Sequence, residues 1–251
     1  MSAGQMKAEQ CMIATADLAL SDRRYQITRP ENTDAIAKSI QGAGLINPPI
    51  VREGQQGYIL VAGFGRAFAC LKLQWPHMPC RVLAGATTTL ECLKIAVADN
   101  ALTRPFNLAE QCRAVTKLGQ FCEDSRSLSN LLESLGLFIA PPLVEKLGRL
   151  AELPEAVQEA AAENYISLNT ALGLESIDRT SAEALAGVFK NLRPSVNQQQ
   201  EIFSGLHDLA RYEKTAIDRL LKAPEFADIL DSAEFDRGRK LQLLRAAIRR
   251  R

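Results

Sequence analysis

The chain has 251 residues and a formal net charge of +1, with 47% hydrophobic and only 6% aromatic residues. This length predicts one large domain or two or three small ones, and the abundance of Ala and Leu favours helix. No uninterrupted apolar run approaches the roughly 20 residues that a bilayer-spanning helix needs, which argues against a membrane protein.

The N-terminal part predicts an arm followed by a helix. Residues 1–22 mix small and polar residues without a clear period, and we expect a loose arm with one short helical turn. A helix then starts at Asn32 or Thr33 as its cap, carries two isoleucines four residues apart and stops at Gly42-Ala43-Gly44.

The next elements predict a hairpin and then a helix between two strands. Ile50-Val51 and Tyr58–Ala62 flank a polar turn that contains glycine. The second of these strands ends at Gly63, a helix runs to about Leu73, and a further strand ends at Gly85. Residues 23–104 are therefore expected to form a small α/β domain.

The remainder has helical period almost throughout. One helix covers "TTLECLKIAVADNAL", and the next is capped by Asn107 with Glu110 three residues later, the spacing of a capping box. Short helices follow, with two or three more beyond Ser167. We expect a helical domain over residues 105–180 and a helical segment over residues 181–251, so that the fold class is α+β.

The cysteines do not point to a metal or redox site. Six cysteines occur singly, no C-x-x-C pair is present, and only two histidines could assist. The beginning of the chain also lacks the apolar stretch of a signal peptide. These features predict reduced thiols in a cytoplasmic protein.

The stretch Gly63-Phe64-Gly65-Arg66 is the first candidate binding site. A strand that ends in glycine and runs into a helix leaves backbone N–H groups free at the helix N-terminus, where phosphate binds. Arg66 adds a side chain that can bind phosphate in a bidentate manner. The alternative is a tight strand–helix turn with a solvated arginine, because neither a dinucleotide fingerprint nor a P-loop is complete.

The second candidate lies in "ADNALTRPFNLAEQ". Asp99, Asn100, Arg104, Asn107 and Glu110 fall within twelve residues at a helix–helix junction. Carboxylate and amide oxygens beside an arginine suit a hydrated magnesium–triphosphate group. The alternative is a helix end followed by a capped helix, which accounts for Asn107 and Glu110 but not for Asn100 and Arg104.

The third candidate is a pair of short helices around Gly136, "SLSNLLESLGL" and "PPLVEKLGRLAELP". Their lengths and apolar spacing are those of a helix-turn-helix, whose second helix enters the DNA major groove. Helical hairpins of the same kind also occur in protein cores, and the pattern alone leaves both readings open.

In this order and spacing the segments resemble the ParB-type partition family, in its broader ParB-like branch. The resemblance extends from about Arg24 to about Gly173. It is carried by four segments: "DAIAKSIQGAGLINPPIVR", "YILVAGFGRAFACLKLQWPHMPCRVL", "DNALTRPFNLAEQ" and "LGRLAELPEAVQEAAAENYISLNTALGL".

The resemblance implies a ParB/sulfiredoxin-type N-terminal domain that binds CTP or another nucleotide with Mg²⁺, and a helical domain that holds DNA. It also implies a homodimer that closes on DNA when nucleotide binds. Carried over by position, the nucleotide-binding residues would be Gly63, Gly65, Arg66, Asn100 and Arg104. Asp99 and Asn100 would assist the metal.

The chain departs from the family at several of these positions. Phe64 and Gly65 stand where partition proteins have Glu and Arg, and Asn47 replaces a glutamine before the proline. Asp99 is one methylene shorter than the glutamate of the family. We therefore expect nucleotide binding with, at most, slow CTP hydrolysis. Sulfiredoxin activity is not expected, because Cys70 lies a full turn beyond the loop.

The central domain also departs from a DNA-binding pattern. The second helix of the pair starts with Pro141-Pro142, which removes two backbone N–H donors. Lys146 and Arg149 remain as its basic candidates for DNA contact. Residues 105–185 hold 6 basic and 12 acidic residues, and this charge opposes binding to the phosphate backbone.

Basic residues return at the end of the chain, in "DRGRKLQLLRAAIRRR". Arg245, Arg249 and Arg250 are candidates for contact with the DNA backbone or an acidic partner. The alternative is a solvated helix end, where cations are favoured by the helix dipole.

The sequence thus predicts a ParB-like, DNA-associated protein with a phosphate-binding loop and a weakened helix-turn-helix, acting in DNA partition or regulation. Two alternatives stay open. One is a protein-interaction adaptor that has lost nucleotide and DNA binding, and the other is a residual CTPase or nuclease.

Overall fold

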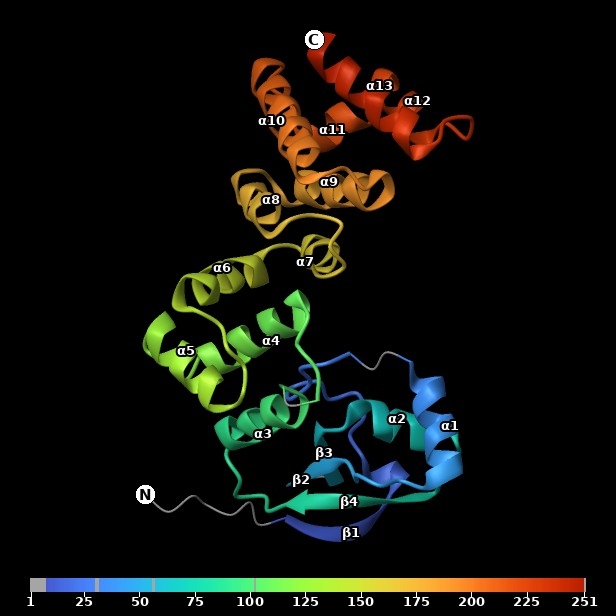
Figure 1. The fold of residues 1–251 in the computed structure, drawn as a ribbon, viewed down its shortest axis with the longest axis vertical. Helices are drawn as coiled ribbons and strands as arrows, with labels where there is room; N and C mark the ends of the chain where they lie inside the picture. Colours follow the sequence, from blue (N-terminus) through green and yellow to red (C-terminus); the bar gives the residue numbers. More distant parts are fainter. Residues whose placement is uncertain (1–7, 30–31, 56, 102, 251) are drawn as a thin grey trace. The chain divides into compact units, whose positions relative to one another are not determined.

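The computed structural model describes residues 8–29, 32–55, 57–101 and 103–250 (Figure 1). The chain divides into two compact units. The first unit comprises residues 1–106 and 113–144, and the second comprises residues 107–112 and 145–251. The finer division predicted at residues 22, 104 and 180 stays a prediction.

The first unit is built on a four-stranded sheet in the order β1-β4-β2-β3. β1 is antiparallel to β4, β4 is parallel to β2, and β2 forms an antiparallel hairpin with β3. The strands are β1 (Ala8–Ala14), β2 (Ile50–Gly54), β3 (Gly57–Ala62) and β4 (His77–Leu83).

The helices of this unit follow the predicted order. They are α1 (Thr33–Ala43), α2 (Phe64–Lys72), α3 (Thr89–Ala101) and α5 (Ser125–Ser134), with a 3-10 turn η1 (Thr15–Asp17). Asn32 caps α1 by accepting a hydrogen bond from the Ala35 N–H, and Gly44 ends the helix at φ 77°. The predicted first helix and hairpin are confirmed.

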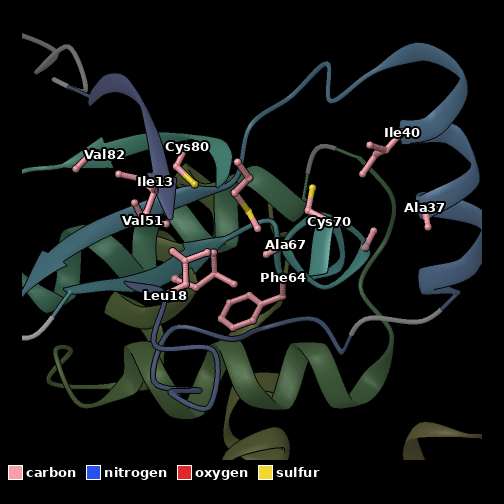
Figure 2. Close-up of a cluster of buried hydrophobic side chains, with 13 residues drawn as sticks. Ile13, Leu18, Ala37, Ile40, Val51, Phe64, Ala67, Cys70, Cys80 and Val82 are labelled. Atoms are coloured by element: carbon pink, nitrogen blue, oxygen red, sulfur yellow. The ribbon is translucent and has the colours of Figure 1, made fainter. Parts of the chain in front are cut away.

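A hydrophobic core lies between the sheet and the α1–α2 pair (Figure 2). Val51, Leu60, Met78 and Cys80 supply the sheet side of this core. Cys80 and Met78 alternate along β4 with residues that face the other side of the sheet. This alternation decides which β4 residues can reach a site outside the core.

The N-terminal segment differs from the expected loose arm. The described residues from Ala8 to Ala14 form an edge strand on β4, followed by the short turn η1. The strand was not recognised because the edge position buries little: only Ile13 is fully buried, while Glu9, Gln10 and Met12 are exposed. The first seven residues lie outside the described part of the chain.

Helices make up the rest of the described chain, which confirms the α+β class. α4 (Leu108–Gly119) and α6 (Pro141–Glu152) contribute residues to both units. The second unit continues with α7 (Glu155–Ala162), α8 (Leu168–Gly173), η2 (Leu174–Ser176), α9 (Arg179–Leu192), α10 (Val196–Tyr212), α11 (Ile217–Leu221), α12 (Pro224–Asp231) and α13 (Arg237–Arg250).

More helices follow Ser167 than the two or three that the sequence predicted. Several breaks are single-residue events, such as Arg193 and Lys214 in left-handed conformation, and Pro224 at the first position of α12. Such breaks hardly disturb the hydrophobic period, so the sequence predicts fewer helices than the structure contains. In the described part of the chain no helix is both long and apolar enough to cross a membrane.

Candidate functional site: an arginine-lined pocket at the start of α2

The turn between β3 and α2 places Arg66 at a helix N-terminus. β3 ends at Ala62, and Gly63 caps α2 in the left-handed conformation with φ 83° and ψ 31°. A side chain is disfavoured at this φ, which explains the glycine. Arg66 lies in the first turn of α2, where N–H groups have no partner within the helix.

Phe64 does not obstruct this turn. Its ring is 4% exposed and belongs to the hydrophobic core beside Leu18 and Ala67 (Figure 2). The guanidinium of Arg23 lies 5.9 Å from the centre of the same ring. The aromatic residue therefore anchors α2 to the sheet and leaves the polar side of the turn open.

Arg66 folds back over Gly63 and makes two contacts. Its Nη1 donates to the carbonyl oxygen of Asn47 at 2.9 Å, and its Nη2 donates to Asp99 Oδ2 at 2.8 Å. The Arg66 and Asp99 side chains are 25% and 28% exposed. Asp99 thus serves as the counter-ion of Arg66, a pairing that joins the two sequence candidates in space.

A pocket of about 760 Å³ opens beside this ion pair, entirely within the first unit. Among the described residues, its charged lining consists of four arginines and a single carboxylate: Arg29, Arg66, Arg81, Arg104 and Asp99. Polar neutral groups add Thr28, Asn32, Asn47, Asn100 and Thr103. The charge excess predicts an anionic ligand with more than one negative group.

The predicted residues Asn100 and Arg104 do line this pocket, together with Gly63 and Gly65. Asn100 Nδ2 donates to the carbonyl oxygen of Ala96 at 2.7 Å, while its Oδ1 accepts from the Thr28 hydroxyl at 3.4 Å. Arg104 Nη1 donates to the Pro105 carbonyl oxygen at 3.1 Å. The fold therefore gathers the five predicted nucleotide-binding residues around one pocket.

The segment that carries Thr28 is held by the second half of α4. Arg113 Nε donates to the Ile27 carbonyl oxygen at 2.5 Å, and Lys117 Nζ donates to the carbonyl oxygens of Arg23 and Arg24. Burial lowers the pKa of Lys117. These bonds fix the backbone that leads into one wall of the pocket.

The two predicted metal ligands, Asp99 and Asn100, are bonded to other groups of the protein. The carboxylate of Asp99 is occupied by Arg66, and the Asn100 amide is engaged on both sides. Within the described ranges no three His, Cys, Asp or Glu side chains cluster for metal binding. Because Mg²⁺ is usually held by one or two carboxylates and by substrate phosphates, the role of Asp99 and Asn100 stays a prediction for the nucleotide-bound protein.

The thiols near the sheet are core residues. Cys70 and Cys80 are fully buried, and burial raises the pKa of Cys70 and brings that of Cys80 to about 12. A thiol in this state is a poor nucleophile, because the reactive form is the thiolate.

The basic residues of α6 are engaged within the second unit. Lys146 Nζ lies 3.4 Å from Asn169 Oδ1. Arg149 binds the Glu175 carboxylate through two nitrogens, with Nε donating to Oε1 at 3.0 Å, and this bond raises the pKa of Arg149. The counter-ion reduces what Arg149 can offer to a DNA phosphate.

Removing this counter-ion should expose a DNA contact. In Glu175→Gln we expect the plot of log binding constant against log salt concentration to steepen by about one unit, because Arg149 becomes available to a phosphate. Fluorescence anisotropy with duplex DNA at several salt concentrations measures this slope. Glu183→Gln is the matched control, since it removes the same charge beside Arg179. Equal slopes in the two variants would mean that Arg149 does not touch DNA.

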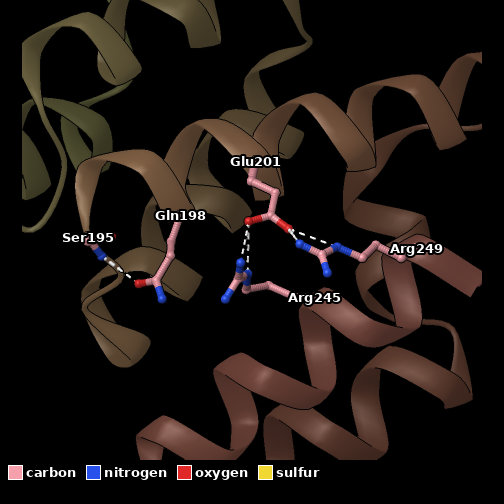
Figure 3. Close-up of polar contacts among 5 residues, drawn as sticks. All are labelled: Ser195, Gln198, Glu201, Arg245 and Arg249. Atoms are coloured by element: carbon pink, nitrogen blue, oxygen red, sulfur yellow. Dashed lines mark hydrogen bonds and ion pairs between the residues drawn. The ribbon is translucent and has the colours of Figure 1, made fainter.

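The C-terminal arginines are likewise paired (Figure 3). Arg245 binds Glu201 Oε2 through Nε at 2.9 Å and Nη2 at 2.6 Å, and Arg249 binds Oε1 through Nε at 3.1 Å and Nη2 at 2.6 Å. Arg245 and then Arg249 lower the pKa of Glu201. The pairing therefore stabilises the protein at neutral pH and is lost as the pH falls below the ordinary value of 4.5.

Arg245 and Arg249 thus tie α13 to α10, and both Arg249 and Arg250 are exposed. The DNA-binding role of these three arginines stays a prediction. The sequence could not show this, because Glu201 lies more than forty residues away.

Sequence reasoning did not assign Thr28, Arg29, Arg81 and Thr103 to the pocket, and it named Asn32 only as a helix cap. For Arg81 a signal was present. It is the sole Asp, Glu, Lys or Arg of the strand "HMPCRVL", and a charge in an otherwise apolar strand usually has a specific partner. Thr28 and Arg29 lie in an irregular segment without any such pattern.

Comparison with known proteins places residues 4–101 in the family model of the ParB N-terminal domain. A nucleoid occlusion protein of Shouchella clausii (strain KSM-K16) is 28% identical over 181 residues, which are 72% of this chain and 60% of that protein. A nucleoid occlusion protein of Lysinibacillus sphaericus (strain C3-41) is 29% identical over 148 residues, 59% of this chain and 48% of that protein. The chain thus spans about half the length of the curated relatives it matches.

Among solved structures, the chain is similar to the C-terminally truncated chromosome-partitioning protein ParB from Caulobacter crescentus complexed with CTP-gamma-S. The identity is 21%, the match covers 72% of this chain and 98% of that chain, and the TM-score is 0.34.

Proposed function

Because the chain is a divergent ParB-like protein, we propose that its N-terminal unit binds the phosphates of a nucleoside triphosphate in the pocket at the start of α2. CTP is the first nucleotide to test, since the ParB-type resemblance implies it. The observation that supports this proposal most directly is the position of Arg66 in the first turn of α2, in a pocket whose described lining carries four arginines and one carboxylate.

Arg66 and Asp99 would exchange partners when the nucleotide binds. The Arg66 guanidinium already faces the pocket, and a phosphate brings more negative charge than one carboxylate. When Arg66 leaves Asp99, the Asp99 carboxylate becomes free and lies beside the phosphates. The free N–H groups of the first turn of α2 would face the same anion.

The proposal extends to DNA and to a second copy of the chain. Lys146, Arg149 and Arg250 are the basic groups through which a ParB-like protein of this sequence would contact the DNA backbone, and we propose a homodimer as the functional unit. The pairing of Arg149 with Glu175 accords with a weakened grip on DNA.

The deciding experiment measures equilibrium binding of CTP, ATP and GTP with Mg²⁺ by isothermal titration calorimetry, with and without DNA. We expect the wild type to bind CTP and Arg66→Ala not to bind it. The variant lacks the guanidinium that would hold a phosphate, and it leaves the Asp99 carboxylate without its counter-ion, so that this carboxylate repels the phosphates. Arg66→Lys should recover only part of the affinity, since an ammonium lacks the planar fork. Arg126→Ala, an exposed arginine on α5, is the matched control. Unchanged CTP affinity in Arg66→Ala would refute the site.

A second candidate function is a protein-interaction adaptor with the ParB-like fold. The internal pairing of Arg149, Arg245 and Arg249 favours it, because these cations serve the protein's own carboxylates. The same titrations separate the two functions: an adaptor binds neither nucleotide nor DNA. Phosphate release, followed in parallel, tests residual CTP hydrolysis.

A further inference from the structure

Arg81 supplies positive charge to the pocket from a direction that α2 does not. It lies on β4, between Gln10 of β1 and Ile50 of β2, so its backbone is in the interior of the sheet. Its neighbours Cys80 and Val82 face the hydrophobic core. By strand alternation the Arg81 side chain leaves from the opposite face, where the pocket lies.

Arg66 and Arg81 approach the same short stretch of backbone. Arg66 Nη1 binds the Asn47 carbonyl oxygen, and the Arg81 N–H donates to the Pro49 carbonyl oxygen at 2.8 Å. Asn47 and Pro48 line the pocket between them. One guanidinium therefore comes from a helix N-terminus and the other from the sheet.

The two arginines differ in whether a carboxylate of the protein neutralises their charge. Arg66 has Asp99 as its counter-ion. For the half-buried Arg81 side chain, no hydrogen bond or ion pair joins it to any group in the described part of the chain. A partly desolvated cation without a counter-ion is costly to keep unless a ligand provides the negative charge. Among the described residues that line the pocket, Asp99 is the one carboxylate, and it already pairs with Arg66.

We propose that Arg81 binds a second phosphoryl group, separate from the one at Arg66, so that the pocket selects ligands with a chain of phosphates over monophosphates. The proposal rests on the proposed function for nucleotides, and it adds the ligand class and a specificity-determining residue. We expect a nucleoside triphosphate to contact both guanidinium groups and a monophosphate to contact one of them.

The test compares CTP, CDP and CMP, and also tripolyphosphate and orthophosphate, on the wild type, Arg81→Gln and Arg81→Lys. We expect Arg81→Gln to lose roughly tenfold or more in affinity for CTP and tripolyphosphate, with CMP and orthophosphate nearly unchanged. The affinity of Arg81→Lys for CTP and tripolyphosphate should lie between those of the wild type and Arg81→Gln. Arg126→Gln is the control, and thermal unfolding of each variant reports whether the fold is kept.

The outcomes separate this proposal from the nucleotide proposal. If tripolyphosphate binds in a manner that depends on Arg81 while no nucleotide binds, the proposed function fails and the second anion subsite stands. Arg81→Gln binding CTP and tripolyphosphate as the wild type does would overturn the subsite. So would an equal loss for all five ligands, or a wild type that binds none of them.

Discussion

In Gly63→Ala we expect CTP affinity to fall about as far as in Arg66→Ala, while the free energy of unfolding drops by only about 1–2 kcal/mol. The two effects have different origins. The stability loss comes from a Cβ at φ 83°, in the left-handed region. The affinity loss comes from the position of that Cβ, 2.9–3.0 Å from the Arg66 guanidinium. The end of a long side chain can move aside, and in doing so Arg66 leaves Asn47 and the position from which it would reach a phosphate.

Calorimetric titration with CTP and chemical denaturation measure the two effects on the same preparation. Gly42→Ala is the matched control, because Gly42 lies in α1 with no atom within 4 Å of an added Cβ and no positive φ. It should keep full CTP affinity and gain up to about 1 kcal/mol of stability from the better helix former. If Gly63→Ala binds CTP normally, the arrangement of Arg66 over Gly63 is irrelevant to binding.

Local signals were sufficient for the turn and its neighbours. Asn32, Gly44 and Gly63 each mark a boundary through their own backbone conformation, so the helix α1 and the end of β3 could be predicted without knowledge of the fold. Asn107 and Glu110 likewise form the expected reciprocal capping bonds at 2.9 and 3.0 Å. Such features depend on a few consecutive residues, and the sequence contains them in full.

The partners of the charged groups could not be predicted in the same way. The metal role expected of Asp99 stays a prediction, but its ion pair with Arg66, which lies 33 residues earlier in the chain, was not predicted. Arg81 belongs to the pocket only because β4 lies in the interior of the sheet, next to β2. The order of the strands is a property of tertiary packing, and the seven residues of β4 do not reveal which strands lie beside it. The sequence therefore indicated the candidate phosphate-binding turn, but not the contribution of Arg81 to the pocket.

The largest stability effect is expected where α10 and α13 approach each other closely. A Cβ added to Gly205 would overlap with Cγ2 of Ile248. Because the β-branched Ile248 is stiff and its Cγ2 is close to the backbone, this side chain cannot swing away as Arg66 can. Gly205→Val must push the helices apart, and we expect a loss of about 3 kcal/mol in the free energy of unfolding. The separation would also loosen Arg245 and Arg249 from Glu201, one turn from Gly205.

A compensating pair of substitutions tests whether the contact itself is responsible. Ile248→Ala alone should cost about 2–5 kcal/mol, since Ile248 is buried. Gly205→Val with Ile248→Ala conserves the number of carbon atoms at the contact, so the double variant should be more stable than the summed losses by about 1–3 kcal/mol. Gly187→Val, at an exposed site of α9 with no atom near an added Cβ, should change stability by less than about 1 kcal/mol. Strict additivity of the two losses, measured by urea denaturation, would show that α10 and α13 do not meet at Gly205. The ion pairs of Glu201 would then have to be held in place by other contacts between these helices.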